Sequence, residues 1–155
     1  MNILLLGCSG QVGWELQRSL AVLGHVTALD ERSTAHCGDF ANSAGIADTV
    51  RALRPDVIVN AAAHTAVDKA ESEPELARQL NATAPGVLAD EAARLGAWLV
   101  HYSTDYVFDG SGTRSWTEAD TPAPLSVYGR TKLEGERLVA ASGCKHLVLR
   151  TSWVY

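Results

Sequence analysis

The amino-acid sequence predicts an α/β fold in which helices cover both faces of a doubly wound parallel sheet. Five apolar runs of strand length are spread along the 155 residues, and they lack the polar alternation of a sheet with one wet face. Segments with helical periodicity separate these runs. Buried strands that alternate with helices are typical of this architecture, and its crossover connections are expected to be right-handed.

The expected strands coincide with the apolar runs, at residues 2–6, 25–29, 56–60, 97–102 and 146–150. A further short strand is expected just before the Gly-Asp-Phe sequence at 38–40. Runs that are apolar throughout indicate strands buried on both faces, as in the centre of a parallel sheet.

Helices are expected between the strands, at residues 11–23, 43–53, 74–95 and 126–142. In the first, leucines follow Val12 at spacings of four, four and three, which places them on one face. The second ends before Pro55, since the residue before a proline disfavours the helical region. The third is alanine-rich and is expected to be adjusted near Pro85.

Residues 103–125 interrupt this alternation with a stretch rich in Gly, Pro, Ser, Thr and Asp. The stretch is far longer than the roughly two to six residues usual between a strand and a helix. Long ordered loops at the carboxyl ends of parallel strands commonly carry function. We therefore expect the functional site at this edge of the sheet.

Composition narrows the class of protein. The 13 basic and 18 acidic side chains give a net charge of −5, a poor surface for nucleic acid or anionic lipid. No apolar run is long enough to span a bilayer, and no basic segment precedes the first one as in a signal peptide. The three cysteines are widely spaced and the five histidines lack ligand spacing, so no disulfide framework or metal site is indicated. We expect a cytoplasmic domain with neither nucleic acid nor membrane as its partner.

Three glycines follow the first strand at three-residue spacing, in the sequence GCSGQVG. Gly7 permits a tight turn, Gly10 lets a pyrophosphate approach the backbone, and Gly13 lets helix and strand pack closely. The helix that begins near Gln11 presents free N–H groups and a positive dipole end to such an anion. A glycine-rich turn without a ligand remains an alternative on this spacing alone.

Acidic and aromatic residues after the second strand extend this pattern. Asp30 lies seventeen positions beyond Gly13, where a carboxylate can accept hydrogen bonds from an adenosine ribose. Asp39 and Phe40 are candidates to lie beside the adenine, although a turn residue and a core phenylalanine explain this spacing as well. Because Arg32 stands near Asp30, the choice between NADH and NADPH stays open. The sequence thus predicts a Rossmann-like dinucleotide-binding domain over residues 1–155.

A candidate catalytic pair lies on the last helix. Tyr128 and Lys132 are four residues apart, so their side chains share one face. A free tyrosine titrates near 10, and we expect the ammonium of Lys132 to lower that pKa and make Tyr128 a general acid or base. Ser103 and Thr104 follow the fourth strand, where a hydroxyl can hold a substrate carbonyl for Tyr128 to protonate.

The sequence resembles the extended short-chain dehydrogenase/reductases, and among them the reductases that act on a dTDP-linked 4-keto sugar. The matching stretches cover nearly the whole chain: GCSGQVG, CGDF, RPDVIVNAAAHTAVDKAESEP, HYSTDYVFDG, PLSVYGRTKLEGE and RTSWVY. NAAAHTAVDKAE and STDYVFDG are much more discriminating than the glycine pattern. The resemblance implies reduction by NADPH or NADH of the C4 keto group of dTDP-4-dehydro-6-deoxy-L-mannose to dTDP-L-rhamnose.

The resemblance also implies a role for each matching residue. Tyr128 would protonate the keto oxygen, Lys132 would also bind the nicotinamide ribose, and Thr104 would polarise the carbonyl. The cofactor would contact, besides Tyr128 and Lys132, the residues Gly7, Gly10, Gln11, Val12, Asp30, Asp39, Phe40, Ala62, Ala63 and Thr65. The sugar would contact, besides Thr104, the residues Val67, Asp105, Tyr106 and Trp153.

Members of this family continue for about as long again, and their second half forms much of the sugar pocket. The sequence ends directly after a strand, with aromatic residues such as Tyr155, so we expect an N-terminal fragment without the C-terminal substrate domain. A homodimer is then expected only of the full-length protein. Two alternatives remain: another nucleotide-sugar epimerase or dehydratase, and a non-catalytic dinucleotide-binding regulatory subunit. STDYVFDG favours the reductase over the first, and the presence of Thr104, Tyr128 and Lys132 disfavours the second.

Overall fold

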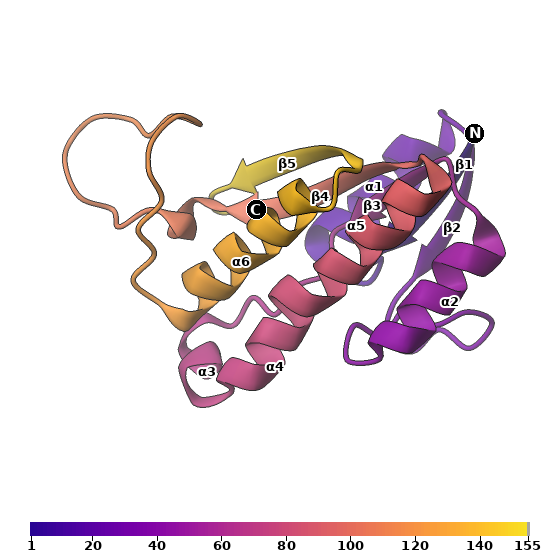
Figure 1. The fold of residues 1–155 in the computed structure, drawn as a ribbon, viewed down its shortest axis with the longest axis horizontal. Coiled ribbons are helices and arrows are strands. Elements are labelled where there is room, and N and C mark those ends of the chain that lie inside the picture. Colours follow the sequence, from indigo (N-terminus) through magenta and orange to yellow (C-terminus); the bar gives the residue numbers. More distant parts are fainter. Residues whose placement is uncertain (155) are drawn as a thin grey trace.

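One parallel sheet of five strands forms the centre of the computed structural model, which describes residues 1–154. The strands are β1 (Asn2–Leu6), β2 (His25–Leu29), β3 (Val57–Asn60), β4 (Trp98–Thr104) and β5 (Lys145–Thr151). Their order is β2-β1-β3-β4-β5, and every neighbouring pair is parallel (Figure 1). All five predicted strands are confirmed within one or two residues at each end. Tyr155 lies outside the described residues.

The strand order reverses at β1, which pairs with β2 on one side and with β3 on the other. The chain therefore leaves the carboxyl ends of β1 and β3 in opposite directions. In open α/β sheets such a switch point leaves a crevice at the carboxyl edge, and ligands bind there.

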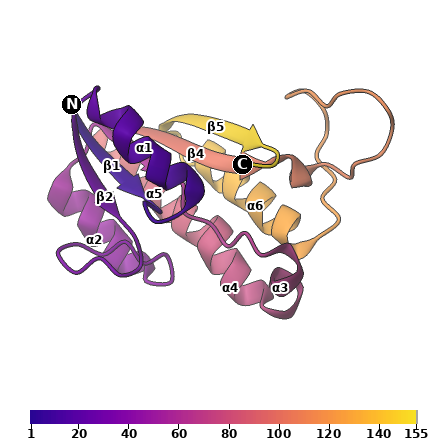
Figure 2. The same cartoon turned by 180° about the vertical axis from the view of Figure 1, so that it is seen from behind.

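Helices cover both faces of the sheet. Helix α1 (Gln11–Ala21) lies on one face, and α2 (Ser43–Leu53), α5 (Ala84–Leu95) and α6 (Val127–Ala141) lie on the other, as Figures 1 and 2 show from opposite sides. The larger apolar core lies between the sheet and the second group of helices, and a smaller one lies under α1. The predicted doubly wound architecture is confirmed.

The segment before α5 is more broken than the single helix predicted for residues 74–95. It consists of α3 (Val67–Ser72), α4 (Pro74–Arg78) and a π-helical turn (Gln79–Thr83), after which α5 begins. Pro85 has no N–H and cannot donate to the carbonyl of Asn81, four residues earlier. Gly135 of α6 packs against that carbonyl so closely that a Cβ would collide with it. The expected adjustment near Pro85 is thus a π turn that sets the contact with α6.

Two smaller expectations were wrong. Helix α1 ends at Ala21, so Leu23 is exposed and does not extend the apolar face. No strand forms between Leu29 and α2, where a short one was expected before residue 38. Helix α2 does end before Pro55 as predicted, with Arg54 in the left-handed region at φ 45°.

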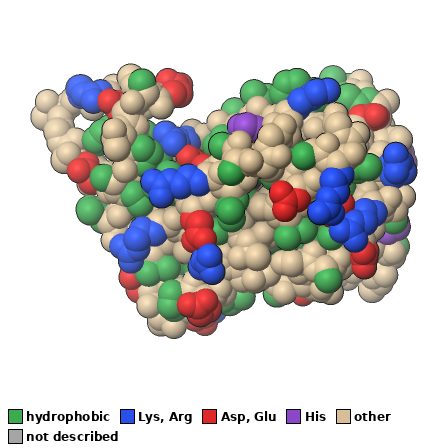
Figure 3. All heavy atoms as spheres, viewed as in Figure 1, with side chains coloured by type: hydrophobic (Ala, Val, Ile, Leu, Met, Phe, Trp, Pro, Cys, Tyr) green, Lys and Arg blue, Asp and Glu red, His purple; other side chains and the backbone are tan. Residues whose placement is uncertain are grey.

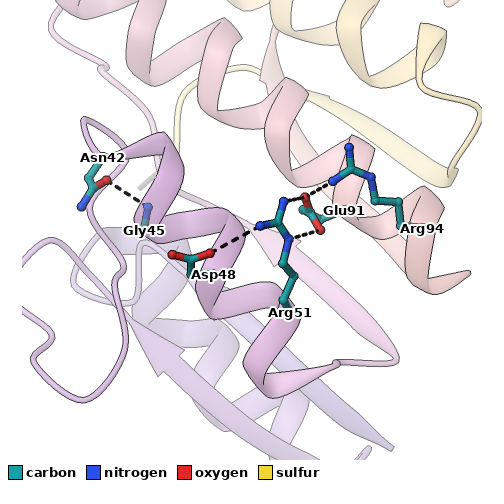
Figure 4. A network of polar contacts seen from close by, with 6 residues as sticks. All are labelled: Asn42, Gly45, Asp48, Arg51, Glu91 and Arg94. Carbon is teal, nitrogen blue, oxygen red and sulfur yellow. Dashed lines mark hydrogen bonds and ion pairs between the residues drawn. The ribbon is translucent and has the colours of Figure 1, made fainter.

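A buried carboxylate joins α2 to α5. Glu91 is nearly fully buried and accepts hydrogen bonds from Arg51 Nε at 3.0 Å and Nη2 at 2.6 Å (Figure 4). Arg94 Nη1 donates to the same carboxylate at 2.6 Å, and Arg51 also pairs with Asp48. The α2 end nearer the site is capped by Asn42, whose side chain accepts from the amide of Gly45. This network fixes α2 against α5 on one face of the sheet.

The loop between β4 and α6 begins with a 3₁₀ turn (Asp105–Val107) and then projects from one end of the molecule (Figure 1). Arg114 and Asp120 form an ion pair inside it, and the amide of Ala123 donates to Val107 O. On the face in Figure 3, acidic and basic side chains lie intermixed. In residues 1–154 no helix has the length and apolar character needed to cross a membrane, and no three His, Cys, Asp or Glu side chains gather into a metal-binding group.

Candidate active site

A cavity of about 730 Å³ lies at the carboxyl edge of the sheet, beside the point where the strand order reverses. Its size suits a large organic ligand. The structure brings together at this cavity all but one of the predicted site residues, namely Gly7, Gly10, Gln11, Val12, Asp39, Phe40, Ala62, Ala63, Thr65, Val67, Thr104, Asp105, Tyr106, Tyr128, Lys132 and Trp153. Segments far apart in the sequence thus line one space, as the order of the motifs predicts.

The three glycines of the first turn differ in what surrounds them. Gly7 has φ 82°, and a Cβ on it would lie 2.5 Å from the amide nitrogen of Ala62. A Cβ on Gly13 would collide with the Gly7 carbonyl. A Cβ on Gly10 would lie 3.5 Å from that same carbonyl oxygen, which is an ordinary contact. The packing of the chain therefore requires the first and third glycines but not the second.

The amino terminus of α1 points its free amides at the space beside Gly10. The first hydrogen bond of the helix runs from Trp14 N to Gly10 O, so the amides of Gln11, Val12 and Gly13 precede it. No side chain caps this end, and its first turn has no acidic residue. Free amides and the positive end of the helix dipole together can bind an anion at this position.

Asp30 is the one predicted residue that does not line the cavity; its neighbour Glu31 does. The Asp30 carboxylate accepts hydrogen bonds from the amide of Arg32 at 3.0 Å and from the hydroxyl of Ser33 at 3.2 Å. These bonds, the backbone one first, lower the pKa of Asp30. In this structure Asp30 acts as a turn residue, so its contact with a ribose stays a prediction.

A polar residue at the end of β3 orders the loop that follows. Asn60 is fully buried, and its Oδ1 accepts from the amide of Ala62 at 3.0 Å. Its Nδ2 therefore donates to His101 Nδ1 on β4, also at 3.0 Å, and the His101 proton resides on Nε2. Burial, and next the charge of Lys132, keep the pKa of His101 well below its usual value. His101 is thus a neutral part of the scaffold beneath the cavity.

Asn81 of the π turn fastens the same loop to α6. Its Oδ1 accepts from the amide of His64 at 2.8 Å, and its Nδ2 donates to the His64 carbonyl at 3.1 Å and to Thr131 Oγ1 at 3.2 Å. The π turn, a feature often found at functional sites, aims this side chain inward. Sequence reasoning missed both Asn60 and Asn81, although the position of Asn81 four residues before a proline was a usable signal.

The predicted catalytic side chains meet at the end of β4. Tyr128 and Lys132 are buried on α6, and β4 extends to Thr104, so Ser103 and Thr104 end this strand rather than follow it. Burial raises the pKa of Tyr128, a hydrogen bond with the Thr104 side chain lowers it, and the charges of Asp105 and Tyr106 raise it. The ring of Tyr106 packs edge-on against that of Tyr128, with 5.7 Å between centroids.

The ammonium of Lys132 does not act on Tyr128 as expected. Its Nζ donates to the carbonyl of Tyr102 at 2.6 Å, and Lys132 is not among the groups that shift the pKa of Tyr128. Full burial lowers the pKa of Lys132 itself to about 8, an effect that the charge of Glu136 partly opposes. The expectation that Lys132 lowers the pKa of Tyr128 was therefore wrong for this structure. Tyr128 is therefore a protonated phenol near neutrality, which is the form that can give a proton to a developing alkoxide.

Two aromatic side chains that line the cavity are exposed and form an open rim. Tyr106 is 41% exposed and Trp153 is 74% exposed, and Asp105 and Val67 line the same cavity. These four residues are those predicted to contact a sugar. An exposed tryptophan on a cavity rim provides a flat apolar surface for a ligand.

Comparison with known proteins agrees with this arrangement. The family described as RmlD substrate binding domain matches residues 1–155. The dTDP-4-dehydrorhamnose reductase of Salmonella typhimurium is 64% identical over the whole chain, which covers 52% of that protein. The solved structure of such a reductase from Clostridium acetobutylicum superposes with a TM-score of 0.93 at 42% identity, over 100% of this chain and 54% of the other.

A second solved reductase, from Bacillus anthracis in complex with NADP, gives a TM-score of 0.91 at 35% identity, over 99% of this chain and 54% of the other. The chain spans about half the length of the curated relatives that it matches. The family match covers residues 1–155, and the structure brings the motif residues together at one cavity. The chain therefore belongs to the RmlD substrate binding domain family.

Proposed function

We propose that this chain is the NAD(P)H-binding half of a reductase that converts the C4 keto group of dTDP-4-dehydro-6-deoxy-L-mannose into the hydroxyl of dTDP-L-rhamnose. One observation carries the proposal: Thr104, Tyr128 and Lys132 line the same cavity as the glycine turn. The names of the relatives at 60% identity and above support the same reaction. The proposed domain extends over residues 1–155.

The residues present fit a dinucleotide. Gly10 has space around its missing Cβ, and the free amides of α1 face that space, so a pyrophosphate can approach there. Asp39 and Phe40 line the cavity on the adenosine side, and Ala62, Ala63 and Thr65 line its middle. The NADP complex of the Bacillus anthracis reductase supports NADPH as the cofactor, and the NAD complex of a Thermus thermophilus UDP-glucose 4-epimerase supports the same kind of site for NADH.

In the proposed reaction the chain provides the residues that bind the keto oxygen and give it a proton. When bound, the reduced dinucleotide provides the hydride for the keto carbon. Thr104 donates a hydrogen bond to the keto oxygen, and the Tyr128 hydroxyl gives that oxygen its proton as the carbonyl π electrons move onto it. Lys132, which would hold the cofactor ribose, carries a buried ammonium whose charge would favour the phenolate that remains. Tyr128 then regains a proton from solvent.

The substrate is a dTDP-sugar, which we place at the open rim formed by Val67, Asp105, Tyr106 and Trp153. The full-length protein would complete this pocket with a second half like that of its relatives. Any homodimer would also involve that second half, and we expect the protein to work in the cytoplasm. An epimerase or dehydratase is disfavoured because Thr104, Asp105 and Tyr106 match the reductase motif, and the catalytic pair disfavours a regulatory subunit.

Two assays test the proposal. Titration of this chain with NADPH and with NADH, followed by quenching of tryptophan fluorescence, should show saturable binding, and no binding to either would contradict the cofactor assignment. Oxidation of NADPH by the full-length protein with the dTDP-4-keto sugar should be lost in Tyr128→Phe while dinucleotide affinity is retained. Equal oxidation by the wild type and the variant would contradict the role of Tyr128.

A further inference from the structure

Glu136 is a buried carboxylate shared by three elements of the fold. It lies on α6 one turn after Lys132 and two turns after Tyr128, on the same face of the helix. Its Oε1 accepts from Ser103 Oγ of β4 at 2.5 Å and from Arg150 Nε of β5 at 2.9 Å. Its Oε2 accepts from Arg150 Nη2 at 2.6 Å. One side chain thus ties the catalytic helix to the ends of both strands beside it.

The bond to Ser103 acts directly on the predicted carbonyl-binding residue. Ser103 and Thr104 are consecutive in β4, so a fixed Ser103 side chain fixes the peptide that carries Thr104. The hydroxyl of Thr151 donates to the Ser103 carbonyl at 3.3 Å, which holds the same peptide from β5. The position of the Thr104 hydroxyl relative to α6 therefore depends on Glu136.

The charges around Glu136 are few and mostly opposite in sign. Arg150 forms a two-bond ion pair with it, and Lys132 lies on the same helix face. His101 of β4 also lies near Lys132 and is neutral, as described above, and Tyr128 lies one turn before Lys132 on α6. Glu118 of the projecting loop acts on Arg150 from outside. Since removal of one partner of a buried ion pair is costly, Glu136 and Arg150 depend on each other.

The projecting loop covers Arg150 through a stack of planar groups. The Arg150 guanidinium lies 5.1 Å from the centroid of Phe108, and Phe108 stacks on Trp116 with 4.7 Å between centroids and 5° between planes. Arg114 lies 5.6 Å from the Trp116 ring and pairs with Asp120. Cation–π contacts and stacked aromatic rings each stabilise such an arrangement. The loop therefore holds Arg150, and Arg150 holds Glu136.

We propose that Glu136 is a positioning residue for the catalytic cluster: it fixes the Thr104 hydroxyl against α6 and provides the negative charge that stabilises the buried ammonium of Lys132. The positioning of a catalytic hydroxyl rests on the proposed function, whereas the electrostatic effect on Lys132 does not. Nothing in the sequence beyond the spacing of Glu136 and Lys132 indicates this role.

The electrostatic part is tested on this chain by NMR of lysines labelled at Cε. The chain has three lysines, and the resonance of Lys132 is identified by its loss in Lys132→Met. Glu136→Gln keeps an acceptor for Ser103 but removes the charge, so the titration midpoint of Lys132 should fall below its wild-type value of about 8. Glu134→Gln is the matched control, since Glu134 pairs with the exposed Arg78 and not with the cluster. Its midpoint should equal that of the wild type.

The positioning part is tested in the full-length protein. Ser103→Ala removes the hydrogen bond and leaves the charge of Glu136, so kcat should fall by about tenfold or more, because misplaced catalytic groups slow the reaction, while dinucleotide affinity is unchanged. The midpoint of Lys132 should not move in this variant. Glu134→Gln should retain the wild-type kcat.

Two results would overturn the inference. A Lys132 midpoint that is the same in Glu136→Gln and the wild type would exclude the electrostatic role. A loss of thermal stability in Ser103→Ala and Glu136→Gln with wild-type kcat would show that the cluster serves the fold alone. If the wild type itself does not oxidise NADPH with the keto sugar, the proposed function fails, while the NMR result still decides the role of Glu136 at Lys132.

Discussion

Tyr128 and Lys132 lie one turn apart on α6, yet the ammonium of Lys132 donates to the carbonyl of Tyr102 and does not lower the pKa of Tyr128, which burial raises. Burial dominates at both side chains and favours the neutral form of each. The structure thus combines a neutral phenol at Tyr128 with a lysine whose charged form is disfavoured by burial. This state suits a proton donor, because the phenol is protonated before a carbonyl oxygen needs its proton.

The burial of Lys132 predicts a pH-dependent stability. Its pKa is about 8 in the fold, against a usual value of 10.5, so between these values the unfolded chain binds the extra proton. Stability from this group therefore rises as the pH rises through that window. Lys132→Met removes the penalty, so its advantage over the wild type in unfolding free energy should shrink by about 3 kcal/mol from pH 8 to pH 10.5. Urea denaturation at several pH values measures this difference, and a constant difference would contradict the buried ammonium.

The glycine turn predicts that alanine at Gly13 lowers stability, whereas alanine at Gly10 lowers dinucleotide affinity and leaves the fold intact. Gly13→Ala places a methyl group into the Gly7 carbonyl and should lower the thermal midpoint strongly. Gly10→Ala meets only an ordinary contact at 3.5 Å, so the chain should fold normally. NADPH titration of the Gly10 variant should nevertheless show affinity reduced by about tenfold or more, because the methyl occupies space for the pyrophosphate. Wild-type affinity in Gly10→Ala would place the phosphates elsewhere.

The role proposed for the Thr104 hydroxyl predicts that kcat falls when the hydroxyl is removed and is retained when serine replaces threonine. Thr104→Val keeps the shape of the side chain but removes the donor to the keto oxygen, so kcat should fall by about a hundredfold. Thr104→Ser keeps the hydroxyl and should retain most of the activity. The two variants are compared in the NADPH oxidation assay with the full-length protein. Equal rates for Val and Ser would show that this hydroxyl does not touch the reacting oxygen.

The ion pairs of Glu91 predict acid sensitivity. Hydrogen bonds from Arg51 lower the pKa of Glu91, so the stabilisation is complete above its usual value of 4.5 and is lost as the pH falls through the lower value of the fold. Arg51→Ala should lower the unfolding free energy at pH 7 only moderately, because Arg51 is half exposed and Arg94 still pairs with Glu91. Below the folded pKa of Glu91 the wild type and the variant should converge in urea denaturation. Arg18→Ala, which removes an exposed pair on α1, is a control that should change little.

Particular residues show what the sequence could predict. The strands could be predicted because apolar runs of this kind are typical of a sheet buried on both faces. The bounds of α2 could be predicted from Pro55, and the start of α1 from its helical spacing. The break at residues 79–83 could not be placed, because the geometry around Asn81 depends on Gly135 of a helix more than fifty residues later. The glycine turn and the pair Tyr128 and Lys132 could be proposed from residue type and spacing, whereas residues such as Val67 and Trp153 were named only through the resemblance to a known family.

The residues that support the site escaped prediction. Asn60, Asn81 and Glu136 are polar side chains whose partners come from other elements, so their roles exist only in the folded chain. Asp30 shows the reverse: its position matched a ribose-binding acid, but the local turn engages its carboxylate. Nearby amides and hydroxyls compete with a ligand to donate hydrogen bonds to such a carboxylate, and residue spacing alone does not show which donor wins.

The most direct test of the proposed reaction is the mass of the sugar nucleotide after incubation of the full-length protein with the dTDP-4-keto sugar and NADPH. Reduction adds one hydride and one proton, so the product should be heavier than the substrate by the mass of two hydrogen atoms, and the Tyr128→Phe variant should leave the substrate unconverted. A product of unchanged mass would indicate an epimerase, and a loss of water would indicate a dehydratase. Either result would contradict the account of Thr104, Tyr128 and Lys132 as a carbonyl-reducing site.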